Sequence, residues 1–229
     1  MIPSEGIRFL KQLKRNNNRE WFQANKHIFE EKLRAPMEAA VDGVNQVLAS
    51  TAPEYVTEPK QAIYRIHRDT RFSPDKTPYK THLGALFPRR GMSKMSGAAF
   101  YFHVAPEGVV VAGGVYFADP KTLLQLRTYL SENHERLSAL LRPKRVKDLC
   151  GDLHGDSLSR PPKGFPADHP AIDLIKRKQW YFDLTLPVEE SAQPGFAKMV
   201  AKRFLAMHPV VDFLNRGIPA PRRGDELLR

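Results

Sequence analysis

The feature that most limits the fold is a change in the spacing of apolar residues along the chain. From residue 4 to residue 48 the apolar side chains recur every three or four positions, as they do in amphipathic helices. From residue 60 to residue 116 they occur instead in short runs rich in β-branched and aromatic residues, bounded by Pro, Gly, Ser and Asp. Helical spacing returns after residue 120. This order lacks the alternation of a βαβ chain and predicts an α+β fold.

The short runs predict strands. Four consecutive antiparallel strands are expected at 61–68, 81–88, 98–105 and 108–116, and the sequence APEG joins the last two at hairpin length. A fifth strand is expected in KQWYFDLTLP, where apolar and polar residues alternate. The sequence therefore predicts an antiparallel, mainly meander sheet of about five strands, covered by N- and C-terminal helices.

The helical segments have recognisable ends. The first helix is expected to start after Ser4, which suits an N-cap. A second, longer helix is expected to start at Asn17 or Asn18, which are expected to cap it, and to bend at Pro36. Two further helices are expected at 120–141 and from about residue 194 to residue 215. We expect one domain over residues 1–216, followed by a frayed tail at 217–229.

Composition narrows the class of protein. The chain has 229 residues, of which 41% are hydrophobic, so it can build a packed core. No run approaches the roughly 20 apolar residues of a membrane helix, and the N-terminus lacks the order of a signal peptide, so a cytoplasmic protein without membrane contact is expected. A single cysteine, Cys150, excludes an internal disulfide and a thiolate metal cluster.

The charge balance favours an acidic partner. The net charge is +11 and the pI is near 9.8, which suits a phosphorylated metabolite, another anion or nucleic acid. The chain has neither a dinucleotide-binding glycine fingerprint nor a phosphate-cradling GxxxxGK[ST] loop. A Rossmann or P-loop enzyme is therefore not expected.

The basic charge is most concentrated in the segment RIHRDTRFSPDKTPYKTH, residues 65–82. Two prolines limit the freedom of its loop, and guanidinium groups can grip phosphate or carboxylate through two hydrogen bonds. The cations of this loop are Arg68, Arg71, Lys76 and Lys80. The segment predicts an anion clamp, with internal pairing of the cations to Asp69 and Asp75 as the alternative.

The alternation of the expected strands places titratable side chains on one face of the sheet. Arg65 and His67 share the polar face of the first strand, Tyr101 and His103 that of the third, and Asp183 that of the fifth. If these faces coincide, the set suits anion binding and proton transfer, with His67 or His103 as acid or base. A shift of one residue in a strand would remove its members from the set.

Two further features bear on this site. The loop GDSLSRPPKGFPADHP offers Arg160 and Lys163 as additional anion-binding cations. A metal site would use His67 and Asp69 with His82 or Asp75, but the adjacent cations oppose a divalent ion. No metal and no cofactor are therefore expected.

Long segments of the chain resemble a known family. NNNREWFQANKHIFE, IYRIHRDTRFSPDKTPYKTHLGALF, VVVAGGVYFADP, GDSLSRPPKGFPADHPAIDLIKRKQW and HPVVDFLN are similar, in this order, to recurrent segments of the family called domain of unknown function 2461 (DUF2461). The resemblance implies a single-domain, intracellular protein whose characteristic residues lie in the segments described above. It implies no catalytic assignment.

Three functions remain open at this point. The first is a site for a phosphate- or carboxylate-bearing small molecule, in which histidine acts as acid or base and Tyr101 or Asp183 orients it. The second is a nucleic-acid-binding module, in which the basic loops, including RRGMSK, follow the phosphates while Phe72 and Tyr79 stack on bases. The third is a protein that binds a partner and has a rigid loop for structural reasons. The oligomeric state is left open.

Overall fold

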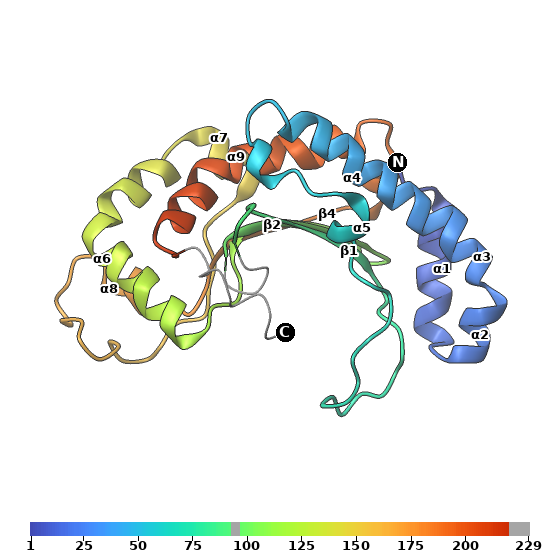
Figure 1. Cartoon of the computed structure of the whole chain (residues 1–229), viewed down its shortest axis with the longest axis horizontal. Coiled ribbons are helices and arrows are strands. Elements are labelled where there is room, and N and C mark those ends of the chain that lie inside the picture. Colours follow the sequence, from blue (N-terminus) through green and yellow to red (C-terminus); the bar gives the residue numbers. More distant parts are fainter. Residues whose placement is uncertain (93–96, 220–229) are drawn as a thin grey trace. The chain divides into compact units, whose positions relative to one another are not determined.

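The computed structural model describes residues 1–92 and 97–219 (Figure 1). Residues 93–96 of the expected basic loop and residues 220–229 of the expected tail lie outside this range. The helices are α1 (Ser4–Arg15), α2 (Arg19–Ala24), α3 (Lys26–Ile28), a π-helical turn (Phe29–Arg34), α4 (Ala35–Leu48), α5 (Pro59–Ala62), α6 (Pro120–Leu141), α7 (Lys144–Cys150), α8 (Ile172–Ile175) and α9 (Phe196–Arg216), with 3-10 turns at Pro53–Tyr55 and Val188–Ala192. The strands are β1 (Leu83–Pro88), β2 (Ala99–Ala105), β3 (Gly108–Val115) and β4 (Trp180–Leu186).

The strands form one open antiparallel sheet in the order β1-β2-β3-β4. Sequential neighbours make this a meander, and helices occupy both ends of the chain, so the predicted α+β class is confirmed. The described residues contain four named strands, one fewer than expected. The short connection between β2 and β3 is the predicted hairpin.

The segment predicted as the first strand is not a regular strand. Its start is the short helix α5, because Pro59 has the fixed φ that suits a first helical turn. The remainder pairs with the following chain only through isolated antiparallel bridges, Ile63 with Ala85 and His67 with Tyr79. In Figure 1 the chain between α5 and β1 accordingly extends as a long loop with two arms. The predicted strand at 61–68 was wrong, although the segment does contact the part of the chain with which it was expected to pair.

The predicted caps of the first two helices have different outcomes. Helix α1 begins at Ser4 itself and Pro3 is the N-cap residue, so the prediction of Ser4 as the cap was wrong. The Ser4 hydroxyl donates instead to the Glu5 carboxylate at 3.2 Å. Asn18 does cap α2, since its side-chain oxygen accepts a hydrogen bond from the backbone N–H of Trp21 at 2.9 Å.

The second helix is not continuous to residue 48. The chain leaves the α-helical geometry at Asn25, and a π-helical turn, Phe29–Arg34, precedes α4. Arg34 and Ala35 keep helical φ and ψ, so the π-helical turn runs directly into α4, and Pro36 lies just after the change from π- to α-helical hydrogen bonding. The interruption therefore comes before the proline rather than at it.

The chain forms two compact units, and each contains parts of the sheet. The first unit comprises Met1–Phe87, Tyr101–Val111 and Thr185–Lys202, and the second comprises Pro88–Phe100, Ala112–Leu184 and the chain from Arg203 onward. The single domain predicted for residues 1–216 stays a prediction. Among the described residues, no helix is long and apolar enough to cross a membrane.

In both units helix α9 packs against the apolar face of β2. In the first unit the ring centroids of Phe102 and Phe196 are 5.8 Å apart, and in the second unit Phe100 stacks on Phe204 at 4.8 Å. Tyr101 and His103 alternate with these phenylalanines and are only half-buried. The predicted division of β2 into an apolar and a polar face is therefore confirmed.

Asparagine side chains pair with backbone groups that have no strand partner. In the first unit the Asn45 amide donates to the Thr57 carbonyl at 2.8 Å and accepts from its N–H at 3.1 Å. In the second unit the Asn215 amide donates to the Ala98 carbonyl at 2.9 Å and accepts from its N–H at 2.8 Å. Each amide thus completes the hydrogen bonding of one extended residue.

We predict that Asn215→Ala lowers the free energy of unfolding by about 2–5 kcal/mol, because it leaves both buried backbone groups of Ala98 without this partner. Urea denaturation measures the loss. Asn16→Ala is the control, since the Asn16 amide makes an exposed hydrogen bond to the Gln12 carbonyl, and it should cost less than about 1 kcal/mol. Equal losses in the two variants would contradict this account.

Candidate functional site

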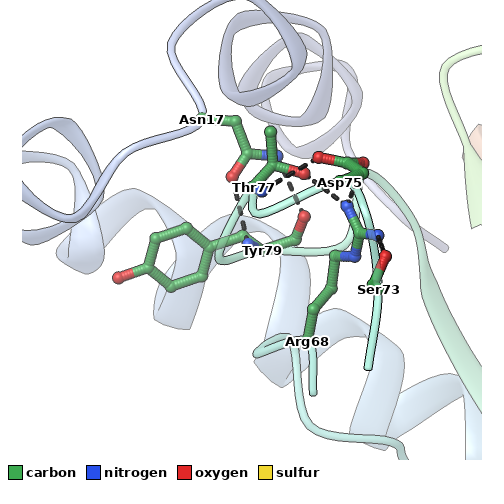
Figure 2. Close-up of polar contacts among 6 residues, drawn as sticks. All are labelled: Asn17, Arg68, Ser73, Asp75, Thr77 and Tyr79. Atoms are coloured by element: carbon green, nitrogen blue, oxygen red, sulfur yellow. Dashed lines mark hydrogen bonds and ion pairs between the residues drawn. The ribbon is translucent and has the colours of Figure 1, made fainter. Parts of the chain in front are cut away.

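The loop between His67 and Tyr79 is held together by the guanidinium group of Arg68. One of its terminal nitrogens donates to the Asp75 carboxylate and to the Thr77 hydroxyl, and the second terminal nitrogen lies 3.4 Å from the Ser73 hydroxyl (Figure 2). Asp75 also accepts from the backbone N–H of Thr77 at 2.9 Å. Residues on both arms of the loop therefore meet at one half-buried side chain.

The other cations near the tip are also paired within the loop. Arg71 donates to both oxygens of Asp69, at 3.0 and 2.8 Å, and the Lys76 ammonium donates to the Thr70 carbonyl at 2.9 Å. The hydrogen bond from Arg71 lowers the pKa of Asp69 to about 2, and that from Arg68 lowers the pKa of Asp75 to about 2. These contacts are the internal pairing considered as the alternative to an anion clamp.

The loop is joined to the helical part of the first unit by Asn17. The Asn17 amide donates to the Tyr79 carbonyl at 2.9 Å and accepts from its N–H at 3.0 Å (Figure 2). The Tyr79 ring stacks on Phe22, with centroids 4.1 Å apart and ring planes within 14°. Tyr79 is buried by these contacts, so it cannot stack on a nucleic-acid base as the second hypothesis required. Asn17 does not cap α2; that role belongs to Asn18 alone.

His67 belongs to this aromatic group. Its ring contacts Tyr79 at a centroid distance of 5.1 Å and Phe22 at 6.0 Å. Within residues 1–92 and 97–219, its ring contacts are with these two residues and do not include Tyr101 or His103. The structure does not bring His67 together with the other predicted acid or base.

A second group of polar rings lies on the half-buried face of the first unit, around the start of β1 and the end of β2. The ring centroids of His82 and His103 are 4.8 Å apart, and those of Tyr101 and His103 are 5.6 Å apart. Tyr64 lies 6.3 Å from Tyr101, and the Lys80 ammonium lies 5.0 Å from the centre of the Tyr64 ring. We call Tyr64, Lys80, His82, Tyr101 and His103 the sheet-face cluster.

Burial sets the protonation of this cluster. Loss of hydration lowers the pKa of His103 to about 4, with a further contribution from His82. It also lowers the pKa of His82, to which Lys80 contributes, and raises the pKa of the Tyr101 hydroxyl. Both imidazoles are therefore neutral at pH 7. The His103 Nδ1 atom is buried without a hydrogen-bond partner among the described residues.

Gly84 makes room for this arrangement. A Cβ atom at position 84 would lie 2.5 Å from the Tyr101 hydroxyl oxygen, closer than any real contact. Gly84 is the second residue of β1 and follows His82 by two positions. The absence of a side chain at Gly84 allows the Tyr101 ring to cover this position.

A pocket of about 360 Å³ opens beside the cluster in the first unit. Its lining includes three cationic side chains and one carboxylate, together with hydroxyl and amide groups. The lining residues are Lys14, Asn17, Arg68, Asp75, Thr77, Tyr79, Lys80, Thr81 and His82. We call the loop between His67 and Tyr79, which Arg68 holds together, the braced loop. The pocket therefore joins the braced loop to the sheet-face cluster through Lys80 and His82.

The cations of the pocket differ in their partners. Lys14 pairs with Glu107 at 2.6 Å, and Arg68 pairs with Asp75. Lys80 is half-buried, and among the described residues its ammonium group contacts the Tyr64 ring and no carboxylate. Burial and the charge of Arg65 lower the pKa of Lys80. Arg65 itself is exposed.

The remaining predicted residues lie in the second unit. Asp183 contacts His154, with 3.6 Å between its carboxylate and the imidazole Nε2, and Arg160 and Lys163 are exposed on the loop before α8. Their convergence with the first-unit residues stays a prediction. The sequence did not identify Lys14, Asn17 or Tyr64 as site residues, and it offered His82 only as a metal ligand.

A metal site needs several His, Cys, Asp or Glu side chains close together. Within the described residues there is no group of three or more His, Cys, Asp or Glu side chains placed to hold a metal ion. Asp69 and Asp75, two of the ligands considered, are each paired with an arginine. The arrangement therefore offers hydrogen-bond donors, one incompletely paired cation and two neutral imidazoles.

We predict that acid destabilises the folded protein through His103. Its pKa in the folded protein, about 4, is below the ordinary value of 6.5, so the unfolded chain binds more protons between these values. Stability should fall as pH drops from about 6.5 to about 4, and His103→Gln should flatten this part of the curve of Tm against pH. His27→Gln, which changes an exposed histidine on α3, is the control. An unchanged curve for His103→Gln would refute the prediction.

The comparisons with known proteins agree with the resemblance seen in the sequence. A family model described as "Conserved hypothetical protein (DUF2461)" matches residues 5–213, a span that includes the braced loop, the sheet-face cluster and all four strands. No curated protein and no solved structure matches the chain. The match covers most of the 229 residues, so the chain belongs to the DUF2461 family.

Proposed function

We propose that the pocket beside Lys80 binds a small molecule that carries a phosphate or carboxylate group. The observation that carries the proposal is the half-buried Lys80 ammonium, which has no carboxylate partner among the described residues. Removing a charge from water without a counter-charge is unfavourable, and a bound anion would supply that counter-charge. The neighbouring Arg65 adds to the positive potential there, as its effect on Lys80 indicates.

The groups around Lys80 suit the oxygens of such an anion. Thr77, Thr81 and His82 line the same pocket and can donate hydrogen bonds. Arg68 also lines it, but its guanidinium is already bonded to Asp75 and Thr77. We therefore assign Lys80 the direct contact with the anion, and Arg68 the role of a positioning residue that holds the loop.

The cluster also supplies groups for proton transfer. His82 and His103 are neutral at pH 7 and can accept a proton, while Tyr101 stays protonated and can donate a hydrogen bond. A phosphate or carboxylate beside them would favour their charged forms. The proposal thus includes an enzyme that uses His82 or His103 as acid or base, whereas the sequence led us to expect His67 or His103 in this role.

We predict that Lys80→Gln weakens the binding of inorganic phosphate by about tenfold or more, because a charge-assisted hydrogen bond is lost. Isothermal titration calorimetry on the full chain measures it. Lys76→Gln is the matched control: it removes the same charge from the same loop, but Lys76 is exposed and, within the part of the chain that the structure describes, bonds only the Thr70 carbonyl. The control should bind as the parent does. Equal affinities for all three proteins, or no binding by the parent, would contradict the proposal.

Nucleic-acid binding is the second candidate, and one observation favours it. Phe72 is 92% exposed at the tip of the braced loop, with the Arg71 guanidinium 5.7 Å from its ring centre. Exposed aromatic rings beside cations stack on unpaired bases. In the same calorimetric series, tight and salt-sensitive binding of single-stranded DNA that depends on Phe72 would favour this candidate over the small anion.

A further inference from the structure

A row of rings in the second unit forms a second candidate site. Tyr181 lies on β4, Tyr116 follows the end of β3, and His154 lies in the segment after α7. The Tyr116 and Tyr181 rings meet edge to face, with centroids 5.2 Å apart and planes at 69°. The His154 and Tyr181 centroids are 6.3 Å apart. These three residues are the aromatic corner.

The backbone explains why these rings are neighbours. His154 forms an antiparallel bridge with Tyr181, in which each N–H donates to the carbonyl of the other residue, at 2.6 and 3.2 Å. Strand β3 is the neighbour of β4 on its other side. Directly opposed residues of antiparallel strands place their side chains on the same face, so three adjacent extended segments contribute one ring each.

The corner is open to solvent. Tyr116 is 68% exposed and the adjacent Phe117 is 56% exposed, although both are large aromatic residues. Buried and exposed residues alternate at the start of β4, with Trp180 and Phe182 in the core and Tyr181 and Asp183 outside it. Exposed aromatic side chains grouped on one face are typical of binding surfaces.

The charge beside the rings is negative, although the chain as a whole carries +11. Asp183 follows Tyr181 by two positions on β4, and Asp156 lies beside the start of this strand, where its carbonyl accepts from the Lys178 N–H at 2.7 Å and its N–H donates to the Gln179 side chain at 3.0 Å. Burial raises the pKa of the Tyr181 hydroxyl, and Asp183, Tyr116 and Asp156 add to this effect. Among the described residues neither carboxylate is paired with a lysine or an arginine; the basic neighbour of Asp183 is the His154 imidazole at 3.6 Å.

We propose that the aromatic corner, together with Asp183 and Asp156, binds an organic cation such as a quaternary ammonium or guanidinium group. Aromatic faces attract such cations through the ring quadrupole, and the carboxylates add the opposite charge. Two rings at 69° give a cation two walls to contact. This site has the opposite charge preference from the pocket beside Lys80, and it does not depend on the function proposed for that pocket.

The probe is choline, added to the full chain and followed by chemical shifts of the protein in two-dimensional NMR. Its neutral isostere 3,3-dimethylbutan-1-ol has the same shape without the charge. We expect choline to bind with a Kd in the millimolar range and the alcohol to bind about tenfold more weakly. Equal binding of the two compounds, or no binding of choline, would overturn the proposal.

Variants locate the site. Tyr116→Ala and Asp183→Asn should each weaken choline binding by about fivefold or more, because they remove a wall and a charge. Phe72→Ala and Asp168→Asn change an exposed aromatic and an exposed acid elsewhere in the chain and should leave it unchanged. Circular dichroism verifies that each variant is folded. Binding of glucose but not choline at Tyr116 and Tyr181 would overturn the preference for a cation, as would parent-like affinity in Tyr116→Ala and Asp183→Asn.

Discussion

The Arg68 guanidinium group is the contact on which the candidate site of the first unit depends. It joins Asp75 and Thr77 on the returning arm of the loop, and Asn17 fixes the backbone of Tyr79 two residues later. Lys80 and His82 lie within three residues of this fixed point, and both line the pocket. A loop braced in this way loses little entropy when a ligand binds, which is the advantage of a preorganised site.

The loop's cations therefore have two different functions. Arg68, Arg71 and Lys76 satisfy groups of the loop itself, and the exposed pairs among them contribute little to stability individually. Lys80 is the cation in the pocket whose charge is not matched by a carboxylate among residues 1–92 and 97–219. A high density of positive charge in a sequence thus does not show which cation is available to a ligand.

Much of the fold could be predicted from the sequence because hydrophobic spacing reflects burial directly. The helix at Pro120–Leu141, the strand at Trp180–Leu186 and the two faces of β2 follow from periods of 3.6 and 2. The prediction of a strand at 61–68 was wrong because the composition of this segment suits a strand, whereas Pro59 favours a helical turn at its start. The break before Pro36 comes from local backbone geometry, which the apolar stripe of 21–48 does not reveal.

The candidate site could be predicted only in part. The sequence identified the segment 65–82 and the polar face with Tyr101 and His103, because residue type and alternation are visible in it. The pairing of Asn17 with Tyr79 spans 62 positions, and the contact between His82 and His103 depends on strand register. Such contacts are decided by tertiary structure. His67 illustrates the limit, since it was expected on the polar face of a strand but lies in an isolated bridge, with its ring against Phe22 and Tyr79.

Among residues 1–92 and 97–219, the half-buried Lys80 ammonium has no carboxylate counter-charge, and we propose that a bound anion supplies it. The most direct measurement is the titration of Lys80 by NMR of its ε-carbon, with and without inorganic phosphate. The account predicts a pKa below the ordinary 10.5 in the free protein, since burial and Arg65 oppose the charge, and a higher pKa when phosphate is present. The same titration midpoint with and without phosphate would contradict it.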